Sequence, residues 1–273
     1  MKKTTFTFIC IVCFANILIA QNPVHWNVSV GGSFPIGNFG AMSYDKNTLA
    51  TDCALFDVDM KNGGAGVGLN IGGEMLYALK TNLNLSVSVD VHYNPLNGDA
   101  KSYTIAMGNY FADVFKQQIL DNGGTSVSSS CSLNKNSTYF NIPLMVGLRY
   151  DIPLVERMRL FAFENVGINI RVITPMSFTT RTNYMMGGYN YVSNIKETFS
   201  YTTEGTFAFR IGAGFQFTDN LSIIASYYYL GAGNIYSKII AEDMDGHVQP
   251  SEQNLELGTV TPMMAVLKLN YSF

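Results

Sequence analysis

Charged residues are scarce in this chain of 273 residues. They make up 14% of it, against roughly 25% in soluble domains. The 17 Lys and Arg do not outnumber the 20 Asp and Glu, which argues against a nucleic-acid partner. Metal-ligand spacings, phosphate-binding loops and nucleotide motifs are also missing from the sequence, so we expect neither a metal nor a cofactor.

Long apolar runs are missing beyond the first 20 residues, and a spanning helix needs about 20 such residues. Residues 1–20 join Lys2 and Lys3 to an apolar stretch that ends at Ala20, which is the pattern of a secretory signal peptide. We therefore predict a signal peptide over 1–20 and one exported domain over 21–273. If such a chain enters a membrane, it must do so as a closed β-barrel.

Cysteine is rare as well. Two of the four cysteines, Cys10 and Cys13, leave with the predicted signal peptide, and Cys53 and Cys131 remain. Two cysteines in an exported protein favour one disulfide, Cys53–Cys131, with two free thiols as the alternative.

What the sequence does have is alternation of apolar and polar residues with a period of two, the pattern of half-buried strands. The clearest case is Leu83 to Tyr93, and the chain ends on another, Val260 to Phe273. Leu269, Tyr271 and Phe273 share the apolar face of that last strand, and we predict that they face lipid and form the signal read by the barrel-assembly machinery. The eight strand candidates are residues 25–34, 64–78, 83–93, 139–150, 159–172, 206–217, 221–230 and 260–273.

The connections between these segments alternate between long and short, as in outer-membrane barrels. The sequence therefore predicts an all-β fold: an eight-stranded antiparallel transmembrane β-barrel in the cell outer membrane, in contact with its lipid, with long external loops and both termini in the periplasm. A soluble lipocalin-like barrel is the alternative, which the aromatic carboxy-terminus disfavours. The long loops are residues 36–63, 94–137, 174–205 and 231–258, and an amphipathic helix is expected within the second, at about 104–120.

Several of these segments resemble a known family. The stretches YFNIPLMVGLRYDI, FENVGINI, FRIGAGFQFTDNLSIIASYYYLG and LKLNYSF are similar to outer-membrane β-barrel proteins of the Bacteroidetes type, which include porin-family and PorT-like proteins. The resemblance extends loosely over the whole exported chain. It implies the fold and the compartment, and a place in a secretion or assembly machine would follow only from the PorT-like members.

Six charged residues fall on the inward faces of the predicted strands. Because an eight-stranded barrel is barely wide enough for its own side chains and buried charges need partners, we predict a lumenal ion-pair network and a closed lumen. Glu74 should pair with Lys268 or Arg149, and Asp90 with Arg210 or Arg171. The six residues are Glu74, Asp90, Arg149, Arg171, Arg210 and Lys268.

Two positions disturb the pattern. The simple register places Glu164 on the lipid face, which is costly, so we expect a bulge or a different register there. Pro143 lies inside a strand and predicts a bulge or irregularity.

Function is less constrained than fold. The sequence favours a structural or surface-interaction role through the long external loops, with an external ligand that it does not identify. A small-solute porin and a secretion or assembly component are the alternatives. We predict no catalytic residue; an enzyme would have to use His92 as base, Asp90 to orient it and Ser86 or Ser88 as nucleophile.

Overall fold

The computed structural model describes residues 24–41, 63–155, 157–243, 245–250 and 255–273. The predicted signal peptide and Cys53 lie outside these ranges and remain predictions. No helix within the described residues is long and apolar enough to cross a membrane.

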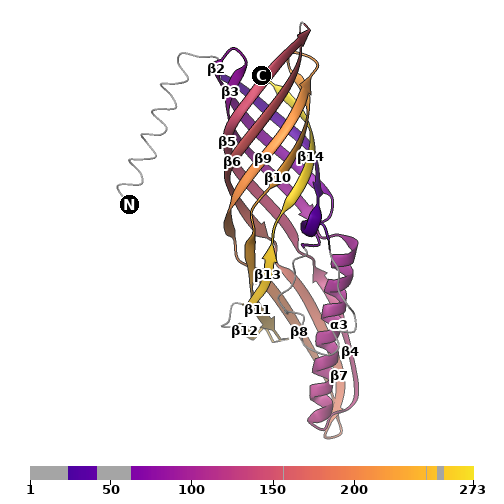
Figure 1. Ribbon diagram of the computed structural model, residues 1–273. Coiled ribbons are helices and arrows are strands. Elements are labelled where there is room, and N and C mark those ends of the chain that lie inside the picture. The colour runs from indigo at the N-terminus through magenta and orange to yellow at the C-terminus, as the bar shows by residue number, and fades with distance from the viewer. Residues whose placement is uncertain (1–23, 42–62, 156, 244, 251–254) are drawn as a thin grey trace, which may run out of the picture.

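Eight antiparallel strands form a closed barrel, as predicted (Figure 1). The first and last strands pair with each other, with Val28 opposite Tyr271, so every barrel strand has two neighbours. Around the barrel the order is β1 (Val24–Pro35), β14 (Met263–Ser272), β10 (Leu221–Tyr229), β9 (Glu204–Gln216), β6 (Met158–Ile173), β5 (Thr138–Val155), β3 (Leu83–Pro95) and β2 (Gly68–Lys80).

The two faces of this barrel are inverted relative to a soluble protein. Inward positions are mostly polar and buried, whereas outward positions carry exposed aliphatic and aromatic side chains. A closed wall with an apolar exterior satisfies its backbone internally and suits lipid, so the protein is an outer-membrane β-barrel. Exposed residues of the wall include Val28, Val30, Leu69, Ile71, Val87, Val89, Val146, Leu148, Val166, Ile168, Ile211, Ile223, Leu267 and Leu269.

The irregularity predicted at Pro143 is confirmed, because the pairing with β3 lapses there, although the register on either side is the same. Two details differ from the sequence-based expectation. Glu164 is exposed on the outer face in an unbroken register, so neither a bulge nor a register change removes it from the wall. The strand predicted from residue 64 begins only at Gly68. Ala65, ahead of this strand, is buried and forms an isolated bridge with Leu96.

The second, third and fourth predicted loops contain the helix and strands of a folded extension. The short turns and the carboxy-terminus lie at one end of the barrel, and a second sheet with one long helix extends from the other end (Figure 1). By the rule that short turns face the periplasm, this extension lies outside the cell. It consists of α3 (Gly98–Asp121), β4 (Thr125–Lys135), β7 (Met176–Met186), β8 (Tyr189–Tyr201), β11 (Gly233–Glu242), β12 (Val248–Pro250) and β13 (Leu255–Val260).

The helix packs against the extension sheet, whose strand order is β12-β11-β8-β7-β4 with β13 also paired to β11. The side chain of Asn97 caps α3 by accepting a hydrogen bond from the Ala100 amide at 2.8 Å. Tyr103, Phe178 and Phe199 form the buried core between helix and sheet. The amphipathic helix predicted for about 104–120 is confirmed and begins six residues earlier.

The orientation can be tested with epitope insertions. An epitope placed between Gly187 and Gly188, both exposed in the β7–β8 turn, should be detected by antibody on intact cells. The same epitope after Asp219, in the short turn between β9 and β10, should be detected only after the outer membrane is permeabilised. The reverse result would place the extension in the periplasm.

Candidate functional site

Arg210 on β9 crosses the middle of the lumen and joins two carboxylates from other strands. Its Nη2 lies 3.2 Å from Oε1 of Glu74 on β2, and its Nη1 lies 3.3 Å from Oδ2 of Asp90 on β3. Asn165 on β6 accepts from Nε and Nη2 of Arg210 at 3.0 and 2.7 Å. One guanidinium therefore ties together four strands.

Lys268 on β14 supplies the second cation of the central cluster. Its Nζ donates to Oδ1 of Asp90 and, at 2.8 Å, to the hydroxyl of Tyr228. Tyr228 in turn donates to Oδ2 of Asp90 at 2.7 Å. The predicted alternative pairing of Lys268 with Glu74 is not formed, because Glu74 is held instead by Arg210, by Ser86 at 2.7 Å and by Asn27 at 3.1 Å.

Arg149 on β5 extends the network toward the short turns. It pairs with Asp151 at 2.8 Å, reaches Glu74 at 4.0 Å and lies 3.6 Å above the ring of Phe161. The connected network then holds three carboxylates, Glu74, Asp90 and Asp151, against three cations, Arg149, Arg210 and Lys268.

Arg171 stands apart from the other five predicted residues. It pairs with Glu204 and donates to the carbonyl of Val260 at 2.9 Å, near the external end of the barrel. Sequence reasoning missed both Glu204 and Asp151. Asp151 shares the inward face of β5 with Arg149, which was a usable signal, whereas Glu204 fell in a segment assigned to a loop.

An apolar layer closes the lumen above the network. The 3-10 helix η1 (Gly37–Phe39) places Phe39 inside the barrel mouth, where its ring packs edge-on against Tyr139 at 5.2 Å. The Tyr139 hydroxyl donates to the carbonyl of Gly63 at 2.8 Å. Leu230 and Met264 are fully buried in the same layer.

Little space remains beside the ion pairs. The cavity lined by Glu74, Asp90, Arg210 and Lys268 measures about 10 Å³, which is at the lower limit for a single water. At this level of the barrel the ion-paired side chains and their described neighbours therefore fill most of the lumen.

The residues of the hypothetical enzyme do not form a catalytic group. His92 is fully buried, with Nδ1 3.2 Å from the Asn70 amide nitrogen and its ring edge-on to Tyr228. The Ser86 hydroxyl donates to Glu74 rather than to His92. Within the described part of the chain neither serine hydroxyl is hydrogen-bonded to the imidazole, and the nucleophile–base contact that such chemistry needs is not formed.

At the end of β14, the predicted assembly residues line the outer wall. Leu269, Tyr271 and Phe273 are exposed, and Tyr271 packs edge-on against Phe273 at 5.1 Å. This placement leaves them accessible to lipid or to another protein, and their recognition by assembly machinery remains a prediction.

The far end of the extension carries a cluster of exposed aromatic and apolar side chains, which we call the outer tip. Tyr184 and Tyr191 face each other across β7 and β8 with stacked rings 5.4 Å apart. Tyr189 and Tyr191 are 71% and 45% exposed, and Met186 is exposed beside them. Gly187 and Gly188 make the turn with positive φ values of 56° and 84°.

Besides Tyr103, the titratable side chains of Cys131 and Glu197 lie between the helix and the sheet of the extension. Cys131 on β4 is half-buried beside Gly108 of α3, and burial raises the pKa of its thiol. Glu197 on β8 lines a small groove of about 180 Å³ beneath α3, and burial likewise raises the pKa of its carboxyl.

Comparisons with known proteins find only distant structural similarity. No family model matches the chain, and no curated protein matches it in sequence. Among solved structures, a major outer membrane protein of Thermus thermophilus aligns with TM-score 0.40 and 13% identity over 92% of this chain and 100% of its own. Ail of Yersinia pestis aligns with TM-score 0.37 and 10% identity over 91% and 98%. OprG of Pseudomonas aeruginosa aligns with TM-score 0.38 and 9% identity over 92% and 97%. Scores and identities this low carry no argument about function, and the strand pairing itself establishes the fold.

The lumenal network predicts a specific pattern of mutant stability. Asp90→Ala removes the carboxylate that pairs with Lys268 and one of the two carboxylates that pair with Arg210, and should lower the free energy of unfolding in lipid by about 3–5 kcal/mol. Adding Lys268→Met removes the cation that Asp90→Ala leaves without a carboxylate, so the double variant should recover part of that loss. Unfolding titrations followed by tryptophan fluorescence would measure both. Strictly additive losses would contradict the coupling.

The disulfide remains open to direct measurement. If Cys53 and Cys131 are joined, mass spectrometry of the non-reduced exported protein should find neither thiol alkylated. Reduction should then expose both. Two thiols that alkylate without reduction would rule the disulfide out.

Proposed function

We propose that this protein is a surface-recognition protein, in which a closed barrel anchors the extramembrane helix and sheet and the outer tip contacts an external ligand. The single observation that carries the proposal is that the chain forms two structurally different parts, a filled barrel and a folded unit outside the membrane. The barrel interior is filled by ion pairs and packed side chains. A folded unit projects from the end of the barrel opposite the short turns (Figure 1) and carries exposed aromatic side chains at its far end.

The outer tip has the composition of a contact surface. Tyr and Met are enriched at protein interfaces, and tyrosine brings a large rigid ring together with a hydroxyl. The stacking of Tyr184 on Tyr191 fixes two of these rings before any ligand arrives. Binding then loses little side-chain entropy, which favours affinity.

The porin alternative has less support. A porin needs a continuous polar path, whereas this lumen narrows to about 10 Å³ at the charge network and is covered by Phe39, Leu230 and Met264. Enzyme activity also has less support, because His92 is fully buried and Ser86 is hydrogen-bonded to Glu74. Membership in a secretion or assembly machine rests on the sequence resemblance to PorT-like proteins.

The proposal predicts that binding depends on the outer tip and not on the barrel. Cells carrying the intact protein should adhere to at least one member of a panel of immobilised polysaccharides, fibronectin, laminin and collagen. The double variant Tyr189→Ser, Tyr191→Ser should reduce that adhesion at least tenfold, because it removes the exposed rings.

Lys196→Ala is the matched control. Lys196 is exposed on the same strand, β8, and forms a surface ion pair with Glu242 at 3.4 Å, which contributes little to stability. This variant should adhere like the intact protein. Adhesion that survives loss of both tyrosines, or that is equally lost in Lys196→Ala, would contradict a specific role for the outer tip.

A further inference from the structure

Glu164 is the one charged side chain on the outward faces of the eight barrel strands as the structure describes them. It stands on β6 between Leu148 of β5 and Ile211 of β9, in an uninterrupted register. Leu160 and Ile168 occupy the same face four residues to either side. With a rise of about 3.3 Å per residue and a strand tilt of about 40°, each lies roughly 10 Å from Glu164 along the membrane normal.

This position leaves the carboxylate inside the apolar band, which is about 25 Å tall in such barrels. No hydrogen bond or ion pair to the Glu164 side chain is formed within the described residues. A glutamate side chain is too short to reach water over such a distance. Lipid amines, which stay at the edges of the band, are too far away to neutralise it.

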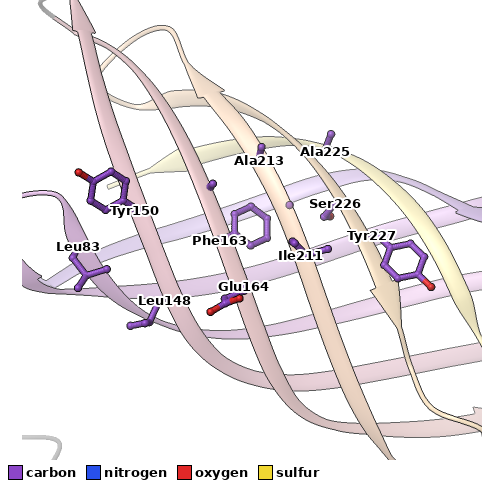
Figure 2. Close-up of a pocket in the computed structure, with 12 residues that line it drawn as sticks. Leu83, Leu148, Tyr150, Phe163, Glu164, Ile211, Ala213, Ala225, Ser226 and Tyr227 are labelled. Atoms are coloured by element: carbon purple, nitrogen blue, oxygen red, sulfur yellow. The ribbon is translucent and has the colours of Figure 1, made fainter.

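The wall beside Glu164 is hollowed. Ala162, Ala213 and Ala225 are direct neighbours across β6, β9 and β10, and they form the floor of an open depression of about 730 Å³. Figure 2 shows Glu164 between Leu148 and Ile211, with Tyr150 and Tyr227 at opposite sides of the depression. Apart from Ser226 and the hydroxyls of Tyr150 and Tyr227, the rest of the lining is apolar. The depression and the carboxylate form one surface, which we call the Glu164 wall.

A second copy of this chain cannot neutralise the charge through its own wall. The outward faces of the described barrel strands contain no lysine, arginine or histidine. Two copies that met at this surface would bring two carboxylates together, which is unfavourable for both. A cation that pairs with Glu164 would therefore come from a different molecule that carries it into the apolar band.

We infer that the Glu164 wall docks a second, different membrane-spanning protein, whose apolar surface fills the alanine depression and whose lysine or arginine pairs with Glu164. Charges at this depth are costly in lipid and commonly mark functional sites. An ion pair between Glu164 and the partner's cation, removed from water, also gives specificity. A partner without the cation would leave the Glu164 carboxylate buried and without a hydrogen-bond partner. The outer tip and the Glu164 wall are separate surfaces, so each can be tested without the other.

Site-specific photo-crosslinking in native outer membranes tests this inference. Benzoylphenylalanine replaces Tyr227 at the edge of the depression, and in a control protein it replaces Tyr93 on β3, on the opposite side of the barrel. The Tyr227 probe should give one protein adduct that the Tyr93 probe does not give. Mass spectrometry should place the crosslink in a membrane-spanning segment that contains lysine or arginine.

Substitutions at Glu164 then decide whether the charge is responsible. Glu164→Leu should reduce the adduct at least tenfold, and Glu164→Asp should retain it. Glu164→Lys combined with glutamate in place of the identified cation should restore it. An adduct that persists in Glu164→Leu, or that contains only lipid or a second copy of this chain, would overturn the inference.

A stability measurement separates docking from a structural role. In the purified protein reconstituted in lipid, Glu164→Leu should raise the unfolding midpoint, because it removes a charge from the apolar band. A lower midpoint would show that Glu164 stabilises the barrel itself and would also overturn the inference.

Discussion

The contact of Arg210 with Glu74 and Asp90 is the interaction on which the rest of the barrel interior depends. Eight strands enclose a space so narrow that every charge within it must find its partner inside the wall. Arg210 forms ion pairs with both carboxylates, and Lys268 forms a second ion pair with Asp90. Arg149 lies between Glu74 and Asp151 and contacts both. The result is an interior that is neutral in sum and closed, tied across the strands by charge-assisted hydrogen bonds.

An interior used in this way directs function to the outside of the molecule. The barrel supplies a rigid anchor, and the chain between its strands is long enough to build a helix and a sheet beyond the membrane. Two outward surfaces have features that membrane anchoring alone does not require. The outer tip exposes tyrosine side chains to water, where charged side chains would be more soluble. The Glu164 wall places a carboxylate among the apolar side chains that face lipid.

The barrel could be predicted from the sequence because lipid demands a strict alternation, and Leu83 to Tyr93 shows it without error. The spacing of apolar residues also predicted helix α3 of the extension. The strands of the extension could not be predicted, because strands such as β7 mix Thr, Ser and Asn with aromatics and lack a clear alternation. The sequence identified lumenal charges by face, but not the partner of Lys268, because strand tilt and stagger decide which side chains meet. At Glu164 the expectation of a bulge was wrong, because the chain keeps its register and leaves the carboxylate outward.

Closure of the lumen by its own side chains is the property on which the anchoring role of the barrel depends. Single-channel recording of the intact protein in planar lipid bilayers tests it most directly, since ion flow needs a water-filled path past Arg210, Glu74 and Asp90. The structure predicts a membrane conductance equal to that of protein-free lipid, apart from rare transient openings. A stable, ohmic channel in the intact protein would contradict the closed lumen and would favour a solute pore.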